Sequence, residues 1–315
     1  MKISKKIITA AKILLTLVFA CYVLSLISFR EVGATLSQIN PLFILVLVVL
    51  FCVFILLGAL NNFLIVLSME EVPFPYVLKA FCISVSVGMF TPAYIGEFGS
   101  MTYLLRKKGF GFAQGLSVPS IDKFLTIIVA TVLFVIGLWA YFPGTSMYIY
   151  LTIFSVLSLL LMCVLFRPLR KRIKSGIIEP LFPWTINYLN SFVSFFLNHA
   201  VLVCLNLMCT FARAFIGALM IWVGLFALGV DRGLWDVMFL NFVARMIGYI
   251  PITINGIGLL EGAAITTLSR LDIPPEPILL AFLIDRSIAA LFGLTVILLL
   301  SGKEGVGFLR QSKTE

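Results

Sequence analysis

The chain has 315 residues, of which 61% are hydrophobic and 12% charged, and its mean hydropathy is +1.14. A soluble domain carries roughly 25% charged residues, so this composition excludes a soluble globular protein and predicts an all-α polytopic membrane protein. The sequence has no nucleotide-binding or zinc motif. The net charge of +9 therefore indicates loops that face a membrane rather than nucleic acid, and we expect neither a metal nor a cofactor.

Six apolar segments are predicted to cross the membrane, since a full span needs about 17–25 apolar residues. A simple hydropathy count would give seven or eight helices, because further apolar stretches are present. One of these, residues 177–198, contains Pro180 and Pro183 near its start and is predicted to be an interfacial or partly inserted helix. Short loops rich in Lys and Arg stay in the cytoplasm, which places both termini there. The six predicted spans cover about 10–29, 42–67, 116–141, 148–166, 200–229 and 278–301.

Two apolar segments, residues 77–105 and 234–270, are interrupted by prolines and glycines. Such breaks are tolerated at membrane depth only where protein or water satisfies the backbone, so we expect two re-entrant broken-helix hairpins. The charge pattern predicts that the first starts from the cytoplasmic face and the second from the outer face. The single transmembrane domain, 1–315, would then be an inverted repeat of residues 7–142 and 147–302. The predicted breaks are Gly88, Pro92, Gly96 and Gly99 in the first hairpin, and Pro251, Gly256, Gly258 and Gly262 in the second.

The two broken segments carry matching polar motifs. The first contains Glu97 and is followed by Asp122-Lys123, and the second contains Glu261 and is followed by Asp285-Arg286. The glutamates lie 164 residues apart and the aspartates 163 residues apart. Paired interruptions at corresponding places in two halves indicate the binding site of a transporter.

Eight ionisable residues fall inside the predicted membrane segments, and their charges sum to zero. An unpaired charge near the bilayer centre costs at least about 2.5–3.5 kcal/mol, so we expect these groups to pair and to face protein or water. Taken singly, each could merely cap a helix or staple two helices, but the set favours a functional cavity in which arginines bind phosphate. The eight candidates are Glu97, Asp122, Lys123, Arg213, Arg245, Glu261, Asp285 and Arg286.

At these motifs the chain resembles the lysylphosphatidylglycerol synthase/flippase transmembrane family. The resemblance rests on Pro92-x-x-x-Gly96-Glu97 with the basic turn Arg106-Lys107-Lys108, and on Asn255-Gly-x-Gly-x-x-Glu261-Gly262, each followed by its acid-base pair. It implies a multi-span protein that flips a lipid made by an attached soluble synthase. The synthase domain is absent from this sequence, so we expect no synthesis of lysylphosphatidylglycerol by this chain. Ser100 and Lys123 stand where family members often have a basic residue and an arginine.

The leading hypothesis is a lipid flippase that moves an anionic or zwitterionic lipid headgroup across a prokaryotic plasma membrane, without enzymatic activity. One alternative is a membrane-embedded accessory subunit of a lipid-linked glycosyltransferase or an aminoacyl-lipid synthase. Another is a small-solute or ion-coupled secondary transporter. The expected partners are membrane lipids and a separate synthase or glycosyltransferase.

Overall fold

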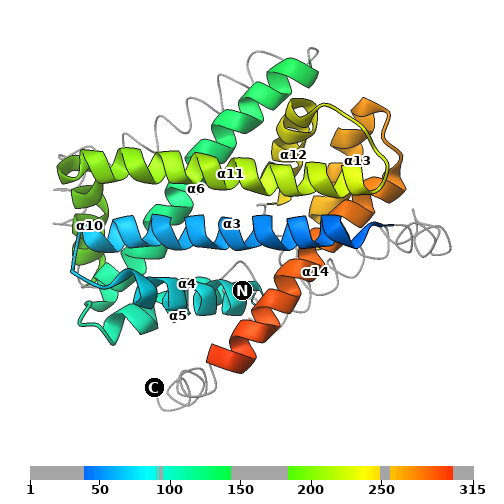
Figure 1. Cartoon of the computed structure of the whole chain (residues 1–315). Coiled ribbons are helices and arrows are strands. Elements are labelled where there is room, and N and C mark those ends of the chain that lie inside the picture. The colour runs from blue at the N-terminus through cyan, green and yellow to red at the C-terminus, as the bar shows by residue number, and fades with distance from the viewer. Residues whose placement is uncertain (1–38, 90, 92–94, 143–183, 249–255, 301–315) are drawn as a thin grey trace, which may run out of the picture.

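The computed structural model describes residues 39–89, 91, 95–142, 184–248 and 256–300, and every regular element in these ranges is helical (Figure 1). The predicted spans at 10–29 and 148–166 lie outside the described residues, as do Pro92 and Pro251. The prediction of an all-α protein is confirmed.

Four long helices are apolar and long enough to cross a membrane. At about 1.5 Å per residue they measure about 39–45 Å, more than the roughly 30 Å hydrocarbon core. Their bounds agree with four of the predicted spans to within four residues, because a span is defined by apolar length alone. The chain is therefore an integral membrane protein. These helices are α3 (Pro41–Leu67), α6 (Phe112–Tyr141), α11 (Ala200–Ala227) and α14 (Pro275–Leu300).

Four shorter helices occupy the two segments that were predicted to be broken. With 10 to 16 residues each, they reach only about 15–24 Å, which is too short to span the hydrocarbon core. The first pair is separated at residues 90–94 and the second at 249–258. They are α4 (Phe74–Met89), α5 (Ile95–Arg106), α12 (Leu234–Gly248) and α13 (Leu259–Leu268), the last continued by the 3₁₀ turn η3 (Ser269–Leu271).

Two of the predicted breaks need correction. Gly99 lies inside α5 and Gly262 inside α13, because an isolated glycine costs a helix only about 1 kcal/mol relative to alanine. Gly88 and Gly96 do flank the first break, and a Cβ atom on Gly88 would lie 2.8 Å from the Cβ of Glu97. In the second break, Gly256 and Gly258 have φ angles of +68° and +79°, which glycine adopts at no steric cost.

Helix α10 (Trp184–Asn198) occupies most of the stretch predicted as residues 177–198. It buries Phe192, Val193 and Phe195, while most of its other residues are partly exposed. The ring of Phe124 on α6 contacts the rings of Phe192 and Phe196, at centroid distances of 5.5 and 5.8 Å. Aromatic packing therefore holds α10 against α6.

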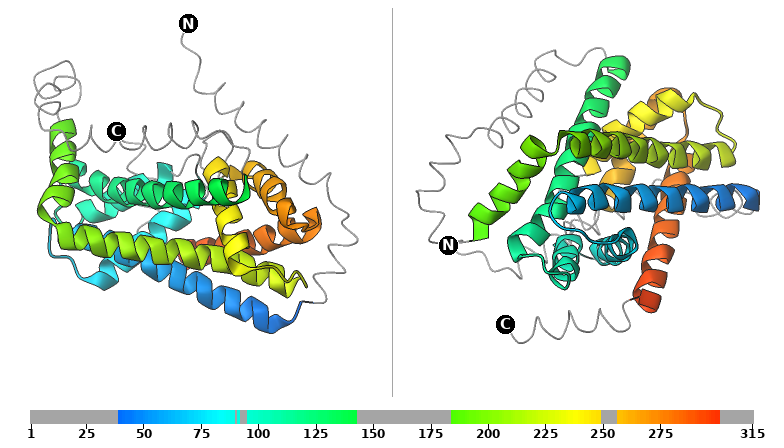
Figure 2. Two further views of the ribbon diagram at one scale, coloured as in Figure 1. Left: turned by 90° about the horizontal axis from the view of Figure 1, so that it is seen from above. Right: turned by 60° about the vertical axis from the view of Figure 1, so that its left-hand side comes forward.

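Helices α3 and α11 are antiparallel along their whole length. Phe43 at the start of α3 contacts Phe226 at the end of α11, with ring centroids 5.9 Å apart. Near the other end, the Asn61 amide donates to Thr210 Oγ1 at 3.0 Å. Both views of Figure 2 keep the two helices side by side. They form the central pair of the bundle.

Apart from α10 and the turn η3, the two halves of the described chain have the same order of elements, and several helix contacts match between halves. The helices that correspond to α3, α4, α5 and α6 in the second half are α11, α12, α13 and α14. The contact of α4 with α14 has its counterpart in the contact of α12 with α6. The contact of α5 with α6 likewise has its counterpart in the contact of α13 with α14. One apolar cluster gathers the end of α3, the outer parts of α4 and α5, and the start of α6. A second gathers the corresponding parts of α11 to α14. Since α3 and α11 are antiparallel, the two clusters lie at opposite ends of the bundle (Figure 1).

The packing of α6 on α12 predicts a strong effect of one glycine. A Cβ atom on Gly137 would lie 2.7 Å from the backbone oxygen of Phe239, which cannot rotate away. We therefore expect Gly137→Ala to lower the free energy of unfolding by about 1–3 kcal/mol through overpacking. Gly262 has no neighbour within 4 Å of its hypothetical Cβ, so Gly262→Ala should be neutral or stabilising by up to about 1 kcal/mol. Thermal unfolding of both variants in detergent checks the prediction, and equal effects would contradict it.

Candidate functional site

The two candidate glutamates occupy the same position in their helices. Glu97 is the third residue of α5 and Glu261 is the third residue of α13. A carboxylate in the first turn of a helix is stabilised by the positive end of the helix dipole. The breaks in the chain place both helix starts, and hence both carboxylates, inside the bundle, where each residue is buried.

Local hydrogen bonds fix the helix starts. The Glu261 carboxylate accepts a hydrogen bond from the backbone N–H of Gly258 at 2.8 Å, which caps α13. At the first break, the Thr91 hydroxyl donates to the Gly88 carbonyl at 3.1 Å and accepts from the Gly96 N–H at 2.9 Å. Thr91 thereby ties the end of α4 to the start of α5. The two breaks use different residues for the same task.

Each glutamate pairs with a basic residue from the next long helix. Lys123 Nζ lies 3.0 Å from Glu97 Oε1, and Arg286 Nε contacts Glu261 Oε1. Lys123 and Arg286 are both the twelfth residue of their helices, α6 and α14. The two halves therefore repeat this ion pair at matching positions.

The aspartates next to these residues face different partners, because adjacent side chains on a helix point about 100° apart. Asp122 lies 3.7 Å from Arg213 on α11, and Asp285 lies 3.8 Å from Arg245 on α12. The two arginines are not equivalent in the two halves. The aspartate pairs therefore differ between the two halves, whereas the glutamate pairs match.

Arg213 sits where α3 crosses α11. A Cβ atom on Gly58 would lie 2.9 Å from the Arg213 guanidinium carbon, and one on Gly217 would lie 3.4 Å from the ring of Phe54. Because each glycine faces a side chain of the other helix, Phe54 of α3 and Arg213 of α11 occupy corresponding positions at the crossing. The Arg213 guanidinium lies 4.6 Å from the centre of the Phe54 ring. Phe81 on α4 adds a second ring at 5.5 Å. Cation–π contacts and an ion pair with Asp122 therefore fix the position of the Arg213 side chain.

The pairs of the two halves meet on α11. Arg245 donates to the backbone carbonyl of Gly217 at 3.5 Å, one helical turn, or about 6 Å, beyond Arg213. All eight residues predicted from the sequence thus fall into four ion pairs, two of which contact α11 through Arg213 and Arg245. We call this set the ion-pair band: Glu97, Lys123, Asp122, Arg213, Arg245, Asp285, Arg286 and Glu261.

The members of the ion-pair band differ in accessibility. The side chains of Glu97, Asp122 and Glu261 are 5%, 1% and 4% exposed, and Arg213 is 12% exposed. The other four range from 22% to 30%. Three carboxylates are therefore covered by protein, while most of the cations can be reached. The four reachable side chains are Lys123, Arg245, Asp285 and Arg286.

Sequence reasoning missed a group of buried amides beside the band, because it considered only ionisable residues. The Asn206 amide donates to the Asn61 carbonyl at 2.8 Å and links α11 to α3. Asn241, fully buried on α12, has no hydrogen-bond partner for either side-chain polar atom. Amides within apolar spans are a usable signal, since polar groups in membrane helices face protein. Among the described residues, no three His, Cys, Asp or Glu side chains are grouped as metal ligands would be.

The long helices and the paired charges between them define a polytopic membrane protein with a polar interior. The family model described as the lysylphosphatidylglycerol synthase TM region matches residues 9–297, and the chain belongs to this family. The family resemblance noted from the motifs is thereby confirmed. No curated protein matches the chain in a sequence comparison.

Proposed function

We propose that this chain is a lipid translocase that moves a phosphate-bearing headgroup across the membrane through the ion-pair band. The observation that carries the proposal is the set of four ion pairs, two of which include a glutamate in the first turn of a helix that follows a break. Charges inside a membrane are costly and are typical of transport sites. If the ion pairs served only to hold helices together, four of the eight side chains would not need to be accessible to a ligand.

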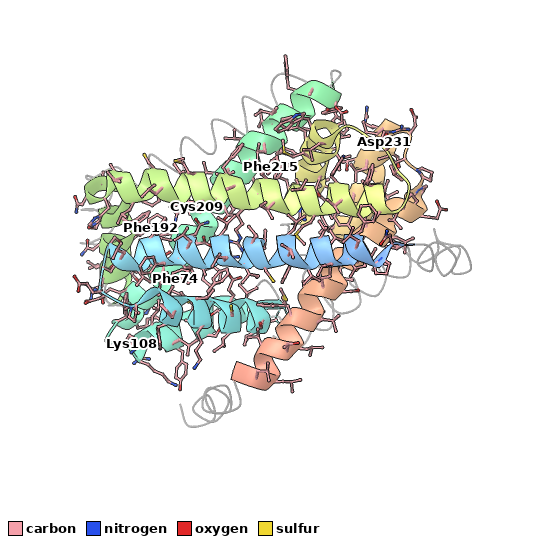
Figure 3. All side chains as sticks on the ribbon, in the orientation of Figure 1. Phe74, Lys108, Phe192, Cys209, Phe215 and Asp231 are labelled. Carbon is pink, nitrogen blue, oxygen red and sulfur yellow. The ribbon has the colours of Figure 1, made fainter. Side chains whose placement is uncertain are left out.

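We infer that the two halves form an inverted repeat with two re-entrant hairpins. Antiparallel α3 and α11 support this inference, because corresponding helices run in opposite directions. Figure 3 places Lys108 and Asp231 at opposite ends of the α3–α11 pair. The end with Lys79, Arg106, Lys107 and Lys108 would be cytoplasmic by the positive-inside rule. The hairpins would then begin from opposite faces of the membrane, and their broken tips would approach each other at mid-depth.

The ion pairs suggest how a headgroup could pass. Guanidinium groups bind phosphate as a fork, and the carboxylates replace the phosphate as counter-charges when the site is empty. Alternate opening of the two hairpin ends would expose the band first to one face and then to the other. The acyl chains would remain in the bilayer. In this proposal the chain performs no chemical reaction.

We place this activity in a prokaryotic plasma membrane, with both termini in the cytoplasm. Membrane lipids are the direct partners. A separate synthase or glycosyltransferase would supply or consume the lipid, because a translocase delivers a substrate made elsewhere.

The test is transport by the purified protein in proteoliposomes. Lipids with a fluorescent headgroup are reconstituted at low protein density, and a membrane-impermeant reductant reports the fraction in the outer leaflet over time. We expect protein-dependent equilibration of phosphate-bearing lipids between leaflets. Rates equal to those of protein-free vesicles, across several anionic and polyprenyl lipids, would rule out the proposal.

A further inference from the structure

We propose that the ion-pair band selects a headgroup that is anionic overall, and that it disfavours a cationic, aminoacylated headgroup. The inference rests on the proposed function and specifies its substrate class. It follows from which charged groups a ligand can reach, not from the balance of all eight charges.

The accessible part of the band is predominantly positive. Of the four side chains with more than a fifth of their surface exposed, three are cations and only Asp285 is an anion. The carboxylates that a cationic headgroup would need are covered: Glu97, Asp122 and Glu261 are each at most 5% exposed. An arriving phosphate therefore meets Lys123, Arg245 and Arg286, whereas an arriving ammonium meets like charges. Between protein helices the effective dielectric constant is lower than in water, which strengthens that repulsion.

Arg245 has unused hydrogen-bonding capacity. Its contact with Asp285 at 3.8 Å is too long for a hydrogen bond, and its contact with the Gly217 carbonyl at 3.5 Å is at the limit. Its Nε, which is covered by protein, has no hydrogen-bond partner either. A guanidinium has five N–H donors in a planar fork. Arg245 can therefore bind a phosphate without first breaking a strong bond.

The covered glutamates hold the other two cations in place. Glu97 contacts Lys123 and Glu261 contacts Arg286, and Glu261 is itself fixed by the Gly258 N–H. These two pairs are positioning contacts that keep positive charge at the accessible surface of the band when no ligand is bound.

The test is equilibrium binding to the full-length protein in detergent, measured by native mass spectrometry. The ligands are short-chain phosphatidylglycerol, its lysyl ester and inorganic phosphate. We expect phosphatidylglycerol to bind about tenfold more tightly than the lysyl ester, a ratio that lies between the repulsion of two unit charges in water and near a protein surface. Equal or tighter binding of the lysyl ester would overturn the inference.

A charge-neutral double variant tests the location of the site. Arg245→Gln with Asp285→Asn removes one accessible cation and one anion together, and should weaken phosphatidylglycerol binding about tenfold. If that variant does not fold, Arg245→Lys keeps the charge without the fork and should show a smaller loss. Arg106→Gln, an exposed residue at the end of α5, is the matched control and should bind normally. Unchanged binding in the band variants would place the ligand elsewhere and overturn the inference.

The remaining outcomes separate this inference from the proposed function. Inorganic phosphate that binds as tightly as the lipid would identify free phosphate as the ligand and overturn a lipid headgroup. Selective binding of the anionic lipid without transport in proteoliposomes would support the inference and contradict the translocase. Transport of the lysyl ester at the rate of phosphatidylglycerol would support the translocase and contradict the inference.

Discussion

Replacing Arg213 with leucine should lower the free energy of unfolding by about 3–5 kcal/mol, which is the typical cost of breaking a buried ion pair. Arg213 is the counter-charge of Asp122, whose side chain is 1% exposed. Without the guanidinium, a buried carboxylate would remain uncompensated. Loss of the contacts with Phe54 and Phe81 adds to the effect. Thermal and denaturant unfolding in detergent would measure it.

The double variant Arg213→Leu with Asp122→Leu is the control for this prediction. Replacing both members of a buried ion pair by apolar residues is often neutral for stability. We therefore expect the double variant to recover most of the stability that the single variant loses. A double variant as unstable as the single one would mean that packing around Arg213, and not the charge of Asp122, dominates the energetics.

Substituting Arg286 with lysine should slow lipid transport by about tenfold while changing the unfolding free energy by less than about 1 kcal/mol. The substitution keeps the charge that compensates Glu261 and copies the Glu97–Lys123 pair of the first half. It removes the planar guanidinium, which, unlike an ammonium group, can bind phosphate at two points. Transport of fluorescent lipid in proteoliposomes and thermal unfolding together check both parts.

A second substitution at the same position distinguishes the loss of the planar guanidinium from the loss of the positive charge. Arg286→Gln removes the counter-charge as well, so transport should fall further and the protein should also become less stable, since Glu261 is buried. Arg106→Gln should leave transport unchanged, because Arg106 is exposed at the end of α5. If Arg286→Lys transports at the normal rate, the fork at this position plays no part in moving the headgroup.

The amino-acid sequence was sufficient to predict the class of the protein, the positions of the four long helices and the broken segments. These properties depend on local apolar length and on helix breakers such as Gly88 and Gly258. The pairing of the eight charges was also foreseeable, because a low-dielectric interior requires neutralisation. The matching glutamates were visible as a repeat, and the structure places both at the third position of a helix.

The choice of partners within the band could not be predicted. Arg213 and Arg245 have no charged counterparts in the other half. The position of α3 that corresponds to Arg213 of α11 is Phe54. The position of α4 that corresponds to Arg245 of α12, the twelfth residue of the helix, is Val85. Nothing local in the sequence assigns one arginine to Asp122 and the other to Asp285. The buried amides Asn61, Asn206 and Asn241 were overlooked because their depth depends on neighbouring helices.

Composition and charge placement alone thus established an all-helical membrane protein with paired charges at two interruptions, because hydropathy and helix breaking act over short stretches of chain. Packing between distant segments decided that α3 crosses α11 at Gly58 and Gly217, that the two halves meet on α11, and that the covered groups are mostly acids. Accessibility and ion-pair geometry arise only when helices far apart in the sequence are brought together. The proposed preference for an anionic headgroup therefore depends on the tertiary structure and not on local sequence.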